Sequence, residues 1–483
     1  MKSSILNPAG GPLVRSGTTN RRVRINVGGK IFESTTATLQ SAGKSSLLAR
    51  SAPSLPSDSA EIFFDRDPRP FALLLALLRT GNLPGASKSF DLDALVEEAE
   101  YYGILDLLSA AMGPSTLDGL DVDRVQMVVS NGRDFPSALS AGADGSLWVG
   151  HGGKITAYDW ALRKQTTTLT ELDRVDSLHR ISESRAAVGS KDFPALHIYD
   201  TMNGTHVKSI AWSDRNDTRI YRTCVQSVTS SGSAIFASFE TGQHTDNTIL
   251  MVDKENLQIV KEIGRENGRS AHSKVATKLL YLGSKDLLMA TGVHGGTFGY
   301  SSYIRLWDVR ADKIVWEWKE PNSNADPRVM ERDSFADVTF NEDLAGIFKV
   351  SVMTGKLAMA DLRHLNSQDP WMHMTETNPA LAVNEGRPDT KLLGYGKQIF
   401  CSRGGDLEVW SEVPLAAASA GLNEKEYWET SFRRNFIEHG RRHTGQEVMA
   451  LAGGGDRLFV ARAEMQGVEV WETHRLVSSE VAL

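Results

Sequence analysis

The chain has 483 residues, of which 41% are hydrophobic and 23% are charged, and its net charge is -7 at neutral pH. This length exceeds what one ordinary core supports, so the sequence predicts two or more domains. The negative net charge leaves no basic footprint for nucleic acid. No apolar run approaches the ~20 residues that a membrane-spanning helix needs, so we expect no membrane partner.

The first 20 residues are rich in Ser, Gly, Pro and Asn and contain no long apolar stretch. They predict a disordered tail rather than a secretory signal. The two cysteines, Cys224 and Cys401, form neither a disulfide framework nor a CxxC metal motif. We therefore expect a cytoplasmic or nuclear protein that needs no metal and no cofactor.

Residues 21–34 alternate between polar and apolar side chains, which is the period of a half-buried strand. Gly28 and Gly29 supply the two left-handed positions of a tight turn, and a return strand begins near Ile31. A phosphate-binding loop would need a longer spacing and a terminal Lys-Ser/Thr pair, so the sequence predicts a hairpin. Three apolar side chains share its inner face: Val23, Ile25 and Val27.

A short strand at Glu61–Asp65 leads into a predicted helix, with Asp67 as the N-cap and Pro68 at the first helical position. Gly81 is expected to end this helix. A second helix begins near Asp91. The inner faces are Phe71, Leu74, Leu75 and Leu78 for the first helix, and Leu92, Leu95, Ala99 and Tyr102 for the second. Three carboxylates of the second helix are interpreted as a solvated outer face rather than an acid/base or metal site: Glu97, Glu98 and Glu100.

Residues 21–112 resemble the BTB/POZ domain of the potassium-channel-tetramerisation class. The resemblance rests on four spaced motifs: VGG at 27–29, DRDP at 65–68, RTG at 79–81 and EAEYYG at 98–103. It implies an α/β domain that self-associates. Many soluble members bind the N-terminal part of cullin-3 and present substrates to a ubiquitin ligase, and a minority are scaffolds without cullin. No pore-forming span follows, which excludes the channel role.

Two sets of site residues follow from this resemblance. The charged strand-to-helix corner, made of Asp65, Arg66 and Asp67, is a candidate oligomer interface. Asp67 could instead be a helix cap alone. The first helix and the loop Ser45–Ser57 form the candidate cullin contact by analogy with the class. Its residues are Leu47, Leu48, Phe71 and Leu74, of which the last two could equally be core because they follow the helical spacing.

The remainder of the chain is repetitive. After a linker at 113–120, residues 121–483 contain seven copies of a short strand that ends in an aromatic or apolar residue, usually followed by Asp, and each copy follows another apolar strand. The copies recur roughly every 40 to 60 residues, the period of a four-stranded propeller blade. They are Lys154–Trp160, Leu196–Thr201, Thr248–Lys254, Tyr303–Arg310, Gly355–Arg363, Asp406–Glu412 and Gly467–Thr473.

The fold class predicted is therefore an α/β BTB/POZ domain followed by an all-β propeller of about seven blades. The repeats resemble a degenerate WD-repeat or YVTN-type propeller, although only Trp307-Asp308 is a full WD pair. We expect the aromatic residue to pack between blades and the Asp to accept hydrogen bonds from turn N–H groups. The segment Asp121–Ser130 is expected to supply the strand that closes the ring.

The chain contains no GxSxG, HExxH, P-loop or Rossmann motif, so we predict no enzyme activity. Its histidines are scattered, and solvated loop histidines are a simpler interpretation than a metal site. Long loops on a propeller face are usual binding surfaces, but a packed insertion with a solvated basic helix at Phe432–His443 is an equal alternative. The candidate substrate face is Trp371, Trp428, Arg433 and Arg434.

The two halves together predict an adaptor that gains avidity from self-association. The leading hypothesis is a substrate-specific adaptor of a cullin-3 ubiquitin ligase, whose partners are itself, cullin-3 and a protein substrate. The alternative is a homo-oligomeric scaffold that acts without cullin, and a propeller enzyme is the weakest. The combination also resembles plant BTB/POZ proteins.

Overall fold

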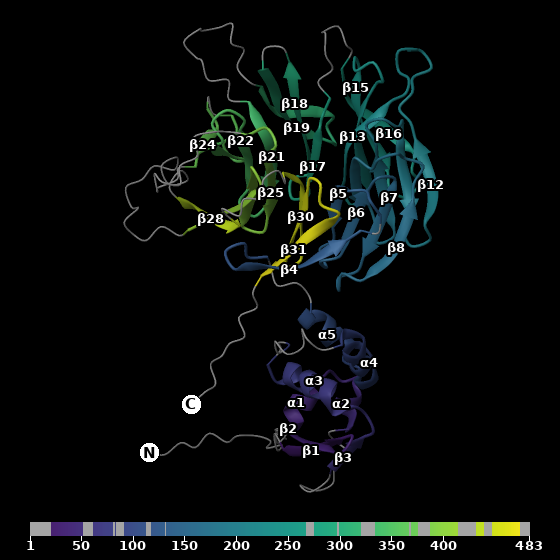
Figure 1. Ribbon diagram of the computed structural model, residues 1–483, viewed down its shortest axis with the longest axis vertical. Helices are drawn as coiled ribbons and strands as arrows, with labels where there is room; N and C mark the ends of the chain where they lie inside the picture. Colours follow the sequence, from purple (N-terminus) through teal and green to yellow (C-terminus); the bar gives the residue numbers. More distant parts are fainter. Residues whose placement is uncertain are drawn as a thin grey trace, which may run out of the picture. The chain divides into compact units, whose positions relative to one another are not determined.

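The computed structural model divides into two compact units, one made of Met1–Gly113 with Arg475–Leu483 and the other of Pro114–His474 (Figure 1). Each is described by itself below. The structure describes residues 21–473 except for the following gaps: 52–60, 81–82, 84–90, 113–116, 131, 267–274, 297–298, 320–333, 367–368, 375–386, 414–430 and 439–446. Within the described residues, no helix is both long and apolar enough to span a membrane.

The first unit packs helices against a three-stranded sheet in the order β2-β1-β3. Strands β1 and β2 are antiparallel and β1 and β3 are parallel. The strands are β1 (Arg22–Val27), β2 (Lys30–Thr35) and β3 (Glu61–Phe64). The helices are α1 (Thr36–Gln40), α2 (Leu47–Ser51), α3 (Pro68–Thr80), α4 (Leu92–Tyr102) and α5 (Leu105–Met112).

The predicted turn, helix start and inner strand face of this unit are confirmed. Gly28 and Gly29 form the turn between β1 and β2 with φ of +51° and +88°. Asp67 precedes α3, and its carboxylate accepts a hydrogen bond from the Arg69 amide at 2.9 Å. Gly81 lies outside the described residues. The predicted inner face of β1 is buried: Val23, Ile25 and Val27.

The carboxylates of α4 lie mostly outward, as predicted: Glu97 and Glu100 are exposed, and Glu98 is the exception. Glu98 is only 5% exposed, and its carboxylate pairs with the Arg66 guanidinium at 2.7 Å. Burial raises the pKa of Glu98, although Arg66 opposes this shift. Arg66 comes from the corner before α3, so the sequence of α4 alone could not show this partner.

The second unit contains, among its described residues, seven four-stranded antiparallel sheets, called blades 1 to 7 here. Blade 1 is β5 (Pro136–Ala141), β6 (Leu147–His151), β7 (Lys154–Tyr158) and β8 (Lys164–Leu169), and blade 2 is β9 (Ser177–Arg180), β10 (Arg185–Gly189), β11 (Leu196–Asp200) and β12 (Thr205–Ile210). Blade 3 is β13 (Cys224–Ser230), β14 (Ala234–Glu240), β15 (Asn247–Asp253) and β16 (Ile259–Glu266). Blade 4 is β17 (Lys278–Leu282), β18 (Leu287–Gly296), β19 (Gly299–Asp308) and β20 (Lys313–Lys319). Blade 5 is β21 (Phe335–Asn341), β22 (Gly346–Ser351), β23 (Leu357–Asp361) and β24 (Trp371–His373); blade 6 is β25 (Lys391–Tyr395), β26 (Gln398–Arg403), β27 (Asp406–Glu412) and β28 (Phe432–Glu438); blade 7 is β29 (Val448–Gly454), β30 (Arg457–Arg462), β31 (Gly467–Thr473) and β4 (Val122–Val129).

The seven blades close into a propeller. Each first strand contacts the first strand of the next blade, and β29 of blade 7 contacts β5 of blade 1. Strand β4, from the beginning of the unit, pairs with β31 from its end, with Val122 opposite Thr473 and Val129 opposite Gly467. The segment that the sequence predicted as the closing strand therefore holds the ring together.

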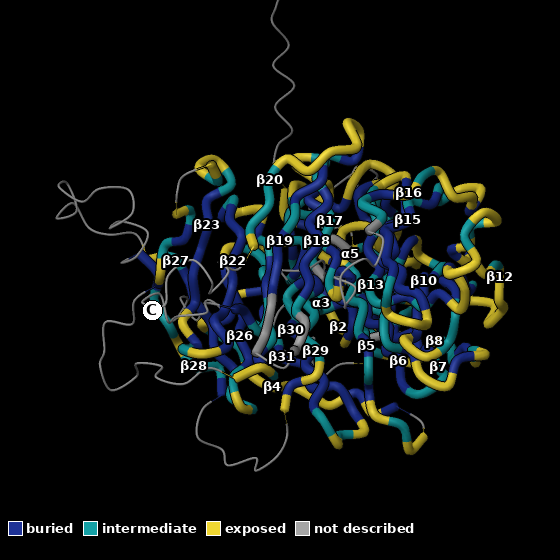
Figure 2. The backbone as a smooth tube through the Cα atoms, turned by 90° about the horizontal axis from the view of Figure 1, so that it is seen from above, coloured by how far each residue is buried: buried dark blue, intermediate teal, exposed yellow. Residues whose placement is uncertain are grey.

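The seven repeats of the sequence are the third strands of the blades, and the apolar strands before them are the second strands. These middle strands are the buried ones, whereas the innermost first strands are partly exposed (Figure 2). In blade 4, Trp307 belongs to the same buried apolar cluster as Ile249 and Ile263 of blade 3. Asp308 then accepts hydrogen bonds from the amides of Arg310 at 2.9 Å and Ala311 at 3.0 Å, as predicted.

Candidate interaction sites

The charged corner between β3 and α3 holds its three residues in different environments. Asp65 is exposed. Arg66 pairs with Glu98 and its guanidinium lies 4.7 Å from the ring centre of Tyr101. Asp67 caps α3 and pairs with Arg69 at 2.7 Å, which lowers the pKa of Asp67 through the Arg69 side-chain hydrogen bonds. Two of the three candidate interface residues therefore already have partners within the same chain.

The four candidate cullin-contact residues are mostly core residues. Leu48, Phe71 and Leu74 are at most 1% exposed and belong to the apolar cluster of the first unit, so they cannot touch a partner while this fold persists. Leu47, at the start of α2, packs against the same cluster but keeps part of its side chain exposed. The predicted contact loop extends into 52–60, outside the described residues.

The candidate substrate face is also placed differently from the prediction. Trp371 begins β24 and is 4% exposed, with the Lys349 ammonium 4.4 Å from its ring centre. The basic stretch begins with a strand, β28, not a loop or a helix, and this strand pairs with β27 at the edge of blade 6. Arg433 is half-buried on β28, and Trp428 lies outside the described residues.

Arg434, the fourth of these residues, belongs to a buried ion cluster that the sequence prediction missed. In blade 6, Glu408 on β27 pairs with Arg403 on β26 at 3.2 Å and with Arg434 on β28. The Arg403 guanidinium also donates to the Gly355 carbonyl of blade 5 at 2.6 Å.

Blade 7 repeats this Arg–Glu–Arg cluster on the equivalent strands. Glu469 pairs with Arg462 at 3.0 Å and with Arg124 at 3.1 Å. Arg462 donates to the Gly405 carbonyl of blade 6 at 2.6 Å and pairs with Glu438 at 2.8 Å. The sequence contains a signal for the pair, since Glu-Val-Trp occurs at both 408–410 and 469–471. Both clusters join neighbouring blades, so their role is structural.

The two rims of the ring differ in their connections. One rim carries the connections that join the fourth strand of a blade to the first strand of the next blade. It also carries the turns between second and third strands. We call it the long-loop rim. It includes 130–135, 170–176, 211–223, 241–246 and 463–466. The turns between first and second strands, such as 142–146, lie on the opposite rim with the entry of β4. The described connections of the long-loop rim, 211–223 above all, favour it as a binding surface.

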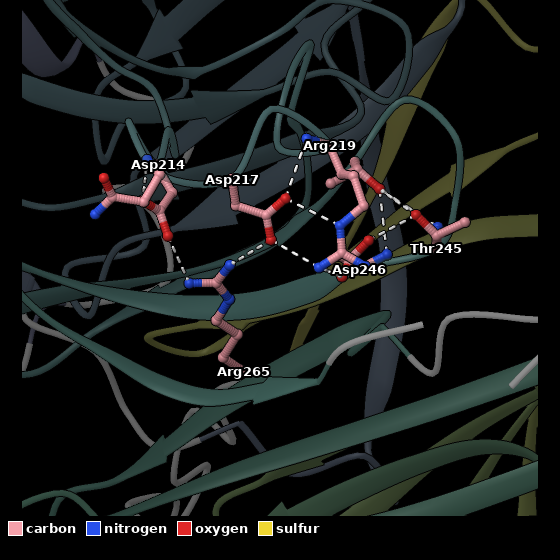
Figure 3. A network of polar contacts seen from close by, with 8 residues as sticks. Asp214, Asp217, Arg219, Thr245, Asp246 and Arg265 are labelled. Carbon is pink, nitrogen blue, oxygen red and sulfur yellow. Dashed lines mark hydrogen bonds and ion pairs between the residues drawn. The ribbon is translucent and has the colours of Figure 1, made fainter. Parts of the chain in front are cut away.

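The connection 211–223 shows how firmly the long-loop rim is held (Figure 3). The Arg265 guanidinium pairs with Asp214 at 2.9 Å and Asp217 at 3.2 Å, and Arg219 pairs with Asp217 at 2.7 Å. The Arg219 hydrogen bonds lower the pKa of Asp217 to about 2. Beside this network, Tyr221 is 47% exposed.

The described residues contain no group of three or more His, Cys, Asp or Glu side chains that could hold a metal ion. Burial raises the pKa of Cys401 to about 12, so this thiol is not an activated nucleophile. The geometry is that of two interaction modules.

Comparison with known proteins agrees with this architecture. The family model described as an At2g24240-like C-terminal β-propeller matches residues 130–473, and that of the BTB/POZ domain matches residues 23–112. The chain belongs to the At2g24240-like BTB/POZ propeller family. Neither family description names a reaction.

Full-length relatives of this BTB/POZ propeller protein occur in Arabidopsis thaliana. BTB/POZ domain-containing protein At5g41330 is 39% identical over 459 residues, which cover 93% of this chain and 96% of the relative. BTB/POZ domain-containing protein At4g30940 is 26% identical over 95% of this chain and 98% of its own. Human BTB/POZ domain-containing protein KCTD5 is 39% identical over 99 residues, or 20% of this chain and 42% of its own.

Proposed function

We propose that this protein is a substrate-specific adaptor of a cullin-3-based ubiquitin ligase in the cytoplasm or nucleus. Its BTB unit self-associates and binds cullin-3, and the propeller recruits a protein substrate for ubiquitination by other subunits. The observation behind this proposal is the presence of a KCTD-like BTB unit and a closed seven-bladed ring in one chain. The chain needs no cofactor and no enzyme activity of its own for this role.

Self-association would use the charged corner, with Asp65 as its available side chain because Arg66 and Asp67 have partners in the same chain. Several propellers on one oligomer would raise the effective concentration for a multivalent substrate. Light scattering of the full chain tests this step. A monomer at high concentration contradicts it.

For the cullin contact, Leu47 is the one predicted residue that keeps exposed surface, so the variant to test is Leu47→Asp. Leu48→Asp would place a charge in the core and is unsuitable. We expect Leu47→Asp to weaken binding to a cullin-3 N-terminal fragment by about 2 kcal/mol or more, roughly thirtyfold. Leu169→Asp, at a 69% exposed position of blade 1, is the control and should bind like the wild type.

The second candidate function is a homo-oligomeric scaffold that acts without cullin. The burial of Leu48, Phe71 and Leu74 favours it, because three of the four residues proposed for the contact have no free surface. If the wild-type protein binds no cullin-3 fragment at micromolar concentration, the scaffold replaces the adaptor. If Leu47→Asp binds as well as the wild type, the adaptor remains and Leu47 is not part of its contact.

A further inference from the structure

A cavity of about 460 Å³ opens on the long-loop rim where blade 7 meets blade 1. Its walls come from the loop Arg133–Ser137, the loop tip at Asp173 and Arg174, the turn at Gly152, and two parts of blade 7 that include Met449 and Glu464. A cavity of this size accommodates a small ligand or one or two side chains of a peptide.

One part of the cavity is apolar. Phe135 and Met449 line it and are 46% and 40% exposed, although both are large apolar side chains. Pro136 and Ala463 also line the cavity. Exposed aromatic and Met side chains at a concave site are typical of surfaces that anchor a partner side chain.

The ionic side chains that line the cavity differ in whether they have partners. Among its ionic side chains, Asp134 pairs with Lys154 at 3.2 Å and Arg174 pairs with Asp176 at 3.2 Å. Arg462 is buried in the blade 7 cluster. Three others have no ion pair or side-chain hydrogen bond within the described residues: Arg133, Asp173 and Glu464. The lining as a whole carries three guanidinium groups and three carboxylates, so the negative excess is confined to its unpaired groups, two carboxylates against one guanidinium.

Hydrogen bonds hold the backbone beside one of the two carboxylates, and the other lies in a tight turn. Beside Asp173, the Val175 amide donates to the Gly152 carbonyl at 2.9 Å, and the Ser137 hydroxyl donates to the Val175 carbonyl at 2.5 Å. Glu464 has a φ of +59°, a left-handed conformation that is unfavourable for a residue with a side chain. A backbone that is already held by hydrogen bonds loses little further entropy on binding.

We propose that this cavity binds an extended peptide segment of the substrate that carries one bulky apolar side chain next to a Lys or Arg. The apolar side chain packs against Phe135 and Met449, and the basic side chain pairs with Asp173 and Glu464. The inference rests on the proposed function only in taking the propeller as the part that recruits substrate. Cullin-3 plays no role in it.

The experiment selects peptides from a random-peptide phage library with the immobilised full chain as bait. We expect a consensus of an aromatic or aliphatic residue adjacent to Lys or Arg. Synthetic peptides with this consensus should lose about tenfold or more in affinity for Asp173→Asn/Glu464→Gln, because a charged hydrogen-bond partner is removed. Phe135→Ala should weaken the same peptides.

The matched control is Asp343→Asn/Glu255→Gln, which neutralises two exposed carboxylates in turns of the opposite rim. It should bind the peptides like the wild type. An acidic consensus, no consensus, or consensus peptides that bind Asp173→Asn/Glu464→Gln with unchanged affinity would each overturn the proposal. None of these results depends on cullin-3 binding, so failure of the adaptor function would be seen separately.

Discussion

The two units of this protein bury their apolar residues in different ways. The BTB unit has one continuous cluster that joins β1, β3 and helices α1 to α5. The propeller has seven smaller clusters, one between each pair of neighbouring blades. Arg–Glu–Arg clusters join the last blades, and they are buried except at Arg124 of blade 7. A blade therefore has no core of its own, and the ring depends on its interfaces and its closure.

The largest effect is expected where the ring closes. Val128 on β4 is 7% exposed and packs between blades 7 and 1. Val128→Asp would bury an unpaired carboxylate, so we expect the free energy of unfolding of the propeller to fall by about 4 kcal/mol or more. The BTB transition should not move. Differential scanning calorimetry of the full chain measures both.

Met127→Asp is the control for ring closure, because the neighbouring side chain on β4 is 41% exposed. It should melt like the wild type. Equal melting of Val128→Asp and the wild type would mean that β4 is not needed to hold the ring, and the comparison between the units would fail at its main point.

A smaller loss is expected from the ion cluster of blade 6. Glu408→Gln leaves Arg403 and Arg434 without their carboxylate, and breaking a buried pair costs about 3 kcal/mol. Chemical denaturation measures this loss. Glu33→Gln in the BTB unit removes an exposed partner of Arg22 and Arg24 and should cost much less, because water screens exposed charges. Equal costs would show that burial does not distinguish the two pairs.

The contact between blades 2 and 3 should make the propeller sensitive to acid. The His179 ring nitrogen lies 2.9 Å from the Ser230 hydroxyl across these blades. Burial lowers the pKa of His179 from 6.5 to about 4. The unfolded chain therefore binds the proton more tightly, so the stability that His179 contributes is present above pH 6.5 and is lost as pH falls to about 4.

His179→Gln should remove about 1 to 3 kcal/mol of this pH dependence, as followed by denaturation at a series of pH values. His373→Gln, at an exposed position on β24, should leave the dependence as it is in the wild type. A pH dependence that survives in His179→Gln would assign it to other groups.

The smallest effect is expected within a single blade. Asp308→Ala removes the acceptor of two turn amides after β19 and should lower the melting temperature of the propeller slightly, without separating the blades. Asp343→Ala, in an exposed turn of blade 5, is the comparison and should be near neutral. Thermal melting of the two variants is sufficient, and a larger loss for Asp343→Ala would contradict the role given to the turn amides.

The sequence by itself determined the local elements of both units. The alternation before Gly28 and Gly29 predicted the hairpin, Asp67 and Pro68 marked the start of α3, and the seven repeats marked the third strand of each blade. These signals are local because strand period, turn conformation and helix capping each depend on a few neighbouring residues. The closing strand was also predictable, since one unmatched strand preceded the first repeat.

Only the tertiary structure decided which charged and apolar residues are free to act. Glu98 is buried because Arg66 reaches it from another element, and Arg434 is buried because Glu408 lies on the neighbouring strand. Leu48 is core because the helices around α2 enclose it. The cavity beside Glu464 joins segments from both ends of the propeller. Burial and ion pairing depend on partners distant in the chain, and a local pattern of residue types does not contain their distances.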